Sequence, residues 1–395
     1  MYNKAARNIG TGARYTQEEI DKFKSGVDPD NYPNKHHLED LFNSGNGLQT
    51  KHNLTFSGGK EGIQYLVSGG YLRQNGNITK NYYDRYDFRV NLNSKLRDNL
   101  NLNIKLFGNK SLQMEPARVD NTVVYDMNQI ISTAAIYNAT IPGKNSDGTY
   151  GVSMGHPSPE ASVDSKSFGK TRNTYFVSDA VLEWDIIQHL KLSGSISDVL
   201  NYTNSKLFGA IFTCNPYYTF GPTQADVNFS NSRNLKLESL INYDNKFGDH
   251  YLHVLGGISQ ETYDNEWVEA YRDNFPSTGL SELNAGSSAN DNNSGSASTW
   301  KLMSYFGRAN YSFQQKYLFE GNILYDGSSR FSKSNRFGLF PSFSAAWNIS
   351  KENFFQIPWI ENFKIRGSYG ILGNQQIGTY PYQKVLSLGY PYVIG

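Results

Sequence analysis

Residues 86–106 read YDFRVNLNSKLRDNLNLNIKL, and the two alternating runs in this stretch decide the fold. Apolar side chains occupy one side of the first run and polar side chains the other, with Ser94 as the exception: Phe88, Val90, Leu92 and Leu96 alternate with Asp87, Arg89, Asn91, Asn93 and Lys95. A period of two is typical of a β-strand with one polar face. The alternation resumes at Leu100 after a polar turn, so the stretch predicts a β-hairpin.

The same hairpin unit recurs along the chain. Further pairs of alternating runs lie at 52–73, 173–204, 233–259, 299–330 and 338–372. The last pair has a longer connection that contains Pro358 and Trp359. Together the runs predict about twelve antiparallel strands, with uncertain ends.

The connections between these strands alternate in length. The short connections lie near 58–62, 97–100, 187–190, 247–251 and 313–317. The long connections are 113–172, 206–232 and 267–298, and those at 76–84 and 331–337 are intermediate. A barrel that crosses a membrane sorts its connections in this way, with short turns on one side and long loops on the other. The pattern therefore predicts an all-β fold, an antiparallel transmembrane β-barrel.

The polar side of the strands carries many charges. The predicted common face holds Asp87, Arg89, Lys95, Glu238, Asp244, Arg308, Glu320, Lys364 and Arg366. A dry core cannot hold so many charges unpaired, whereas a water-filled lumen can. Charges that face bulk water from a soluble sheet are the alternative.

Aromatic residues make up 14% of the chain, with 28 Tyr and 23 Phe, while hydrophobic residues make up only 38%. Many of the rings lie at predicted strand ends, which suits the aromatic girdles of a membrane barrel. The girdle candidates are Tyr82, Tyr83, Tyr86, Tyr311, Phe313, Tyr317, Phe319 and Tyr325. Cross-strand aromatic pairs of an ordinary sheet, or a soluble lectin or propeller, explain the same composition.

Bulk composition excludes several classes of protein. The net charge of +1 offers no electrostatic footprint for nucleic acid. The single cysteine, Cys214, rules out an internal disulfide or a thiolate zinc site, and we expect an unremarkable buried or loop thiol. The chain has no run of 18 apolar residues and no signal peptide at its start. An outer-membrane protein needs a signal peptide, so we expect the start to be truncated.

No catalytic or metal-binding constellation stands out. Residues 194–197 match only part of a nucleophile motif. His36 and His37 lack a third spaced ligand, so we expect loop histidines without a role. Residues 145–149 resemble the start of a calcium loop but lack its terminal Glu, so a plain turn is favoured. A phosphate-binding loop is absent. We therefore predict no enzyme activity, no catalytic residue, no metal site and no cofactor.

Aromatic residues in the predicted loops are the candidates for contact with a sugar or peptide, since sugars stack on rings. They are Tyr82, Tyr83, Tyr217, Tyr218 and Trp267. A girdle or loop-packing role is favoured for each of them. The substrate-binding residues therefore stay unassigned.

One segment breaks the strand pattern. Thr16 and Glu19 form a capping-box pattern, which predicts a short helix over 16–24 that ends at Gly26. Residues 28–34 follow as a turn. We predict that residues 1–48 form an outer loop with a short helix and that residues 49–395 form part of a barrel.

Several stretches resemble the SusC/RagA family of outer-membrane proteins. They are YTQEEIDKF at 15–23, DPDNYPN at 28–34, HNLTFSGG at 52–59, YDGSSRF at 325–331, GLFPSFSAAWNI at 338–349 and KIRGSYGILGNQ at 364–375. These stretches occur in the family's order and span nearly the whole chain.

The resemblance implies a TonB-dependent transporter of the Bacteroidetes outer membrane. Such a protein has a 22-stranded barrel closed by an N-terminal plug, a SusD-like surface lipoprotein as partner, and energy supplied through TonB. Its cargo is a glycan or, in some members, an oligopeptide.

The chain departs from this family pattern at both ends. If the family resemblance holds, the chain has about twelve of the expected 22 strands and no plug domain. We therefore expect an internal barrel fragment that is inactive alone. A passive porin or an adhesin barrel is the alternative function, and an outer-membrane enzyme such as a phospholipase is a third.

Overall fold

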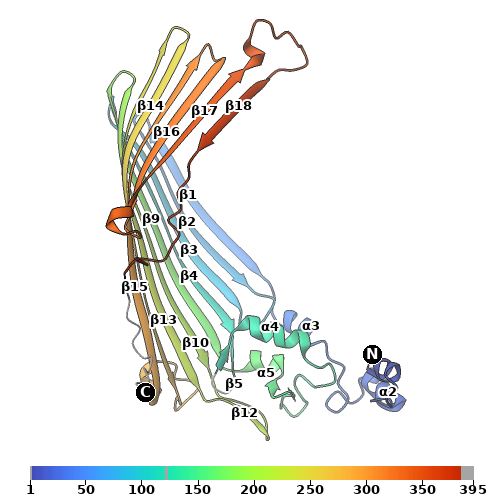
Figure 1. The fold of residues 1–395 in the computed structure, drawn as a ribbon. Helices are drawn as coiled ribbons and strands as arrows, with labels where there is room; N and C mark the ends of the chain where they lie inside the picture. The colour runs from blue at the N-terminus through green and yellow to red at the C-terminus, as the bar shows by residue number, and fades with distance from the viewer. Residues whose placement is uncertain (1, 121–122, 384–395) are drawn as a thin grey trace, which may run out of the picture.

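The computed structural model describes residues 2–120 and 123–383, and its main feature is one twelve-stranded antiparallel sheet (Figure 1). Each strand pairs with its neighbours in chain order, which confirms the predicted series of hairpins. The strands are β1 (Gln49–Lys60), β2 (Ile63–Asn75), β3 (Tyr82–Arg97), β4 (Leu100–Pro116), β9 (Phe168–Ile187), β10 (Leu190–Gly209), β13 (Gln224–Phe247), β14 (His250–Asp273), β15 (Ser287–Phe313), β16 (Tyr317–Ser328), β17 (Phe337–Asn348) and β18 (Lys364–Gly370).

The sheet is curved, and the loop helices and the segment after β18 lie on its concave side (Figure 1). Residues paired across neighbouring strands share one face, so the register assigns each side chain to the concave or the convex face. Phe56, Val67, Val90 and Leu106 form one such row across β1 to β4, on the convex face. Phe56 is 60% exposed although it is apolar. A convex face of exposed apolar side chains is the surface that contact with lipid requires.

The convex apolar belt has a defined width. It runs on β2 from Ile63 to Arg73 and on β13 from Tyr243 to Arg233, about ten residues, as a tilted membrane-crossing strand needs. Ion pairs mark its far edge: Arg73 Nη1 lies 2.9 Å from Asp84 Oδ2, and Arg233 Nη2 lies 2.9 Å from Asp198 Oδ2. Charged pairs of this kind belong in the interface beyond the hydrocarbon.

Aromatic rings line the belt on its convex side. The ring of Tyr317 stacks between those of Phe313 and Trp347, with centroids 6.4 and 6.5 Å away. Tyr325 likewise lies between Tyr305 and Phe337. By the strand registers, all the predicted girdle residues except Tyr83 are on the convex face. Tyr83 is on the concave face.

Three strands continue far beyond the belt. β13 and β14 have 24 residues each and β15 has 27. The predicted loops at 206–232 and 267–298 were therefore too long, because 224–232, 267–273 and 287–298 are strand. Residues 287–298 are rich in Ser and Asn and show no apolar alternation, and the alternation of Ala225, Val227 and Phe229 in 224–232 is short. Backbone hydrogen bonds to a neighbouring strand hold them in the sheet, and such bonds need no apolar face.

The longer connections fold into a layer of their own at one end of the sheet (Figure 1). Three apolar cores hold this layer together. One joins α3 (His37–Phe42), α4 (Met127–Ile136) and α5 (Pro159–Asp164) with Ile78. Another joins Phe275 of the β14–β15 connection to Phe208 on β10. The third surrounds Cys214, which is 1% exposed and whose pKa burial raises to about 12. The expectation of a buried thiol is confirmed.

Small elements complete this layer. They are α1 (Tyr2–Asn8), α2 (Gln17–Ser25), β5 (Arg118–Asp120), β6 (Val123–Tyr125), β7 (Val152–Ser153), β8 (His156–Pro157), β11 (Phe212–Asn215), β12 (Tyr218–Phe220) and the 3₁₀ turns η1 (Leu283–Ala285) and η2 (Lys333–Asn335). The capping box of α2 is confirmed, with Thr16 as N-cap and Gly26 in a left-handed conformation at φ 65°. Residues 145–149 form a turn, as predicted.

The short connections lie together at the other end (Figure 1). Their predicted positions are confirmed at 61–62, 98–99, 188–189, 248–249 and 314–316. The connection from β17 to β18 is longer and contains η3 (Ile349–Lys351). Glu352 ties it to the neighbouring turn, since its carboxylate accepts hydrogen bonds from Trp347 Nε1 at 3.0 Å, Lys316 Nζ at 3.0 Å and Tyr317 Oη at 2.8 Å.

A charge in the middle of the convex belt should prevent stable insertion, whereas the same charge one residue away should not. Ile104 is on the convex face and Asn103 on the concave face. Ile104→Arg is expected to cost about 2–4 kcal/mol in a bilayer, because the guanidinium meets hydrocarbon. Asn103→Arg is the matched control and should be close to neutral. Urea unfolding of the protein in lipid vesicles measures both, and equal costs would contradict the assignment of the faces.

Acid should weaken the Glu352 tether. The hydrogen bonds from Trp347, Lys316 and Tyr317 lower the pKa of Glu352 to about 2. The folded-state pKa lies below the ordinary value of 4.5, so the stabilisation is present above pH 4.5 and is lost as pH falls toward 2. Glu352→Gln should remove this part of the acid dependence, and Glu361→Gln, at an exposed position of the same connection, should retain it. Thermal unfolding between pH 6 and 2 provides the measurement.

Candidate functional site: the concave face and its pocket

The concave face of the sheet is polar. By the strand registers, all nine charged residues predicted to share a face are on it, on β3, β13, β15, β16 and β18. They have polar neighbours: Arg308 Nε donates to Asn322 Oδ1 at 2.7 Å, and Lys236 lies 2.8 Å from Glu238. This face is suited to water and to a polar cargo.

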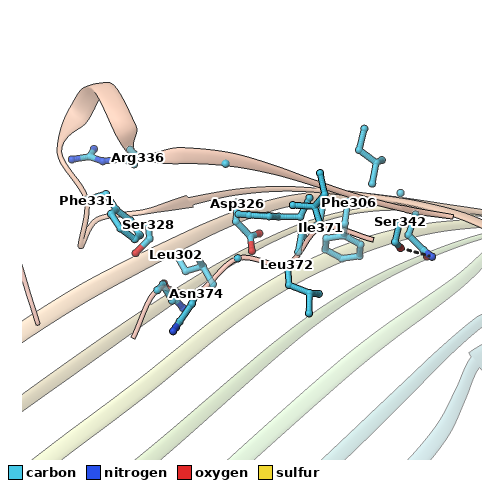
Figure 2. Close-up of a pocket in the computed structure, with 18 of the residues that line it drawn as sticks. Leu302, Phe306, Asp326, Ser328, Phe331, Arg336, Ser342, Ile371, Leu372 and Asn374 are labelled. Atoms are coloured by element: carbon cyan, nitrogen blue, oxygen red, sulfur yellow. Dashed lines mark hydrogen bonds between the residues drawn. The ribbon is translucent and has the colours of Figure 1, made fainter. Parts of the chain in front are cut away.

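The concave face is hollowed over the middle of β15, the last residues of β16 and the first residues of β17 (Figure 2). The pocket has a volume of about 810 Å³, which is large enough for a sugar unit or a short peptide segment. Its walls are mostly apolar, with a few charged and amide groups. They include Leu255, Leu302, Phe306, Leu324, Phe331, Phe340, Ile371 and Leu372, together with Arg308, Asn322, Asp326, Arg336, Asn374 and Gln375.

The segment that follows β18 closes one side of this pocket (Figure 2). A Cβ on Gly373 would clash with the ring of Phe340, so glycine suits the close approach of the backbone to this ring. Arg330 holds the segment further on, because its Nη1 donates to Ile377 O at 2.5 Å and its guanidinium lies 5.1 Å from the ring of Trp300. The pocket therefore depends on parts of the chain that are distant in sequence.

Several polar atoms at the pocket are buried without a hydrogen-bond partner among the described residues. They are Asp326 Oδ1, Arg336 Nε and Gln375 Oε1. Buried polar atoms ordinarily have partners, so these atoms are free to bind polar groups of a ligand. The lining residues include no histidine or cysteine, and Asp326 is the one carboxylate among them. Apolar walls with a few fixed polar groups are typical of binding.

The aromatic residues proposed from the sequence do not meet at this pocket. Tyr82 is on the convex face, where the guanidinium of Arg73 lies 4.2 Å from its ring centroid. Tyr83 and Trp267 are on the concave face of different strands. Tyr217 is 90% exposed and Tyr218 47% exposed, both in the β10–β13 connection. None of the five lines the pocket.

The pocket residues instead come from stretches that the sequence had singled out for another reason. Residues 325–331, 338–349 and 364–375 carry the family resemblance, and each contributes to the lining. Sequence reasoning missed them as a site because the concave positions of β16 and β17 read simply as strand. The one hint of this site in the sequence was that three family-like stretches, 325–331, 338–349 and 364–375, follow closely on one another.

His37 has a structural role, contrary to the expectation of a loop histidine without one. It is 3% exposed, and its Nδ1 lies 3.1 Å from Glu160 Oε1. Its Nε2 lies 3.1 Å from Ile141 O, and its ring meets the ring of Tyr137 edge-on at 4.8 Å. The residue joins α3 to the β4–β9 connection.

The described residues contain neither a cluster of metal ligands nor a membrane-spanning helix. No group of three or more His, Cys, Asp or Glu side chains in 2–120 and 123–383 could hold a metal ion. Within the same ranges, no helix has the length and apolar character needed to cross a membrane.

Removing the His37 ring should loosen the loop layer. His37→Ala leaves Glu160 and two carbonyl oxygens without their partner, and we expect a cost of about 1–3 kcal/mol. His36→Ala is the matched control, because His36 is the exposed neighbour. Limited proteolysis of the 117–167 connection is the measurement. Equal cleavage rates in the two variants would show that His37 does not hold the layer together.

The curated relatives found by comparison are TonB-dependent receptors. No family model matches the chain. The TonB-dependent receptor P3 of Formosa agariphila is 28% identical over 351 residues, which cover 87% of this chain and 34% of the receptor. The TonB-dependent receptor SusC of Bacteroides thetaiotaomicron is 28% identical over 361 residues, which cover 84% of this chain and 34% of SusC. The chain thus spans about a third of the length of these curated relatives.

The fold comparison agrees. The structure of the RagAB peptide transporter superposes with a TM-score of 0.76 at 19% identity, covering 97% of this chain and 45% of that one. RagAB in the closed-closed state gives a TM-score of 0.72 at 20% identity, covering 85% and 38%. These likenesses show that the sheet has the fold of a TonB-dependent transporter barrel.

Proposed function

We propose that this chain, a relative of the SusC/RagA-type TonB-dependent receptors, forms part of the barrel of an outer-membrane transporter that imports glycans or oligopeptides. One observation carries the proposal: a single sheet has a convex face suited to lipid and a concave face suited to water. Such a sheet separates a membrane from a lumen. Its role is to bind and pass cargo, and it needs no catalytic residue for that.

The concave pocket supports binding of cargo with both apolar and polar groups. Phe306 and Phe340 offer ring faces, on which a sugar or an apolar side chain packs. Asp326, Arg336 and Gln375 offer the polar atoms that lack a partner. RagAB is described as a peptide importer, which makes peptide a reasonable cargo class for this chain beside glycan.

The loop layer supports the proposal of a surface lipoprotein partner. The layer has its own apolar cores, so it presents a folded surface at the loop end of the sheet. A SusD-like lipoprotein would bind at this end and deliver cargo to the concave face. TonB would act from the opposite side of the membrane, at the end with short turns. We also propose the division of the chain at residue 48, since β1 begins at Gln49. Residues 384–395 of the second part lie outside the described residues.

A passive porin or adhesin barrel is the competing function. It would share the belt and the polar lumen, but it would not depend on energy from TonB. The test therefore uses the full-length protein that contains this chain, expressed in outer membranes with its partner lipoprotein. Uptake of labelled oligopeptide and glycan mixtures should stop when a protonophore removes the proton-motive force or when TonB is deleted. Uptake that continues unchanged under both treatments would favour a passive pore.

Asp326→Ala should weaken cargo binding in the same full-length protein. The substitution removes the one carboxylate of the pocket, and a lost charged hydrogen bond corresponds to about a ten- to hundredfold weaker dissociation constant. Asp291→Asn on the exposed part of β15 is the control and should bind normally. Isothermal titration with the transported cargo measures the change. If Asp326→Ala binds the cargo with unchanged affinity, this pocket is not a binding site for the cargo.

A further inference from the structure

Three cations lie close together on the convex face, beyond the apolar belt. They are Lys170 and Arg172 on β9 and Lys206 on β10. Lys170 and Lys206 are paired directly across the two strands, and Arg172 follows two residues along β9. Like charges at directly opposed positions of a sheet destabilise it unless an anion lies between them.

The protein itself supplies little negative charge here. Lys206 Nζ lies 3.1 Å from Glu282 Oε1 and donates to Ser281 O at 3.0 Å. Among the described residues, Lys170 and Arg172 have no carboxylate within 4 Å. One exposed carboxylate therefore faces three cations, and Arg172 is exposed to the surroundings of the convex face.

The cations line a preformed groove rather than a flat surface. The groove of about 260 Å³ lies between the strands and residues 281–283, and Phe168, Val227 and Phe229 supply its apolar part. The loop above it is fixed in place, since Arg272 Nη1 donates to Gly286 O at 3.3 Å and Phe275 packs edge-on against Phe208 at 5.7 Å. A groove with apolar and cationic walls fits a ligand that has both characters.

The position of the groove relative to the belt narrows the class of ligand. Through Leu112, Arg172 lies in the same hydrogen-bonded row as Asp84, one of the ion-pair residues at the edge of the belt. Lys170, and Lys206 opposite it, lie two residues further out, about 5 Å at a tilt of about 40°. The phospholipid headgroup layer is only about 5–8 Å thick on each side. The cations therefore begin at headgroup level and continue outward, as the anionic sugars of a glycolipid do.

We propose that the groove at Lys170, Arg172 and Lys206 binds the anionic sugar core of an outer-leaflet glycolipid, through its phosphate or carboxylate groups. The inference rests on the proposed outer-membrane location and concerns the lipid-facing side, not the cargo path. Such a ligand would neutralise the opposed lysines and fix the protruding strands to the surrounding leaflet.

The test measures glycolipid binding by the full-length protein in phosphatidylcholine nanodiscs. The probes are lipopolysaccharide with a phosphorylated inner core, the same molecule after removal of its phosphates, phosphatidylglycerol and inorganic phosphate. The variant is Lys170→Gln/Arg172→Gln/Lys206→Gln. The matched control, Lys60→Gln/Arg97→Gln/Lys351→Gln, removes the same charge at the short-turn end. Heat-dependent gel migration checks that each variant is folded, and Arg172→Lys tests whether charge alone is sufficient.

The triple variant should bind phosphorylated lipopolysaccharide at least about tenfold more weakly than the wild type, while the control and Arg172→Lys stay within about twofold of it. Binding should weaken with salt. Unchanged affinity in the triple variant would overturn the proposal. So would equal binding of the phosphate-free glycolipid, or inorganic phosphate or phosphatidylglycerol binding as tightly as the glycolipid. Cargo uptake is scored separately, so a protein that binds glycolipid but transports nothing would refute the transport role and leave this site standing.

Discussion

The backbone hydrogen-bond ladder between consecutive strands is the constraint on which the whole structure depends. In lipid, every buried amide and carbonyl needs a partner within the protein, because no water is present to replace it. An antiparallel meander meets this demand with short turns, and each of the twelve strands pairs with its neighbour in sequence. Once the backbone is satisfied in this way, the side chains are free to make the two faces chemically opposite.

That opposition organises the rest of the molecule. The convex belt is apolar over about ten residues of each strand and ends at ion pairs such as Arg73–Asp84. Beyond the belt, the same ladder carries β13, β14 and β15 on into the aqueous side. The protruding strands then provide a base for the loop layer, for the concave pocket and for the cationic groove around Lys206.

The concave pocket and the convex groove serve different neighbours. The pocket faces the lumen and combines rings with polar atoms that have no partner, which suits a passing cargo. The groove faces outward above the belt and combines apolar walls with cations, which suits an anionic amphiphile. Both are closed by chain segments that leave the sheet and fold back, residues 371–375 in one case and 281–283 in the other. In this fold, connections that leave the strands create the binding surfaces.

The sequence by itself determined the strand series, the short turns and the face on which each charge lies. These features are local, because a period of two places Asp87 and Phe88 on opposite faces whatever surrounds them. The capping box at Thr16 is local in the same way. The tertiary structure alone decided how far β13 to β15 extend, because the backbone partners that hold those polar stretches lie on neighbouring strands. It also decided that His37 meets Glu160, that Lys170 lies opposite Lys206, and that Phe340 packs under Gly373. Each of these contacts joins residues far apart in the chain, and no local pattern encodes the register that brings them together.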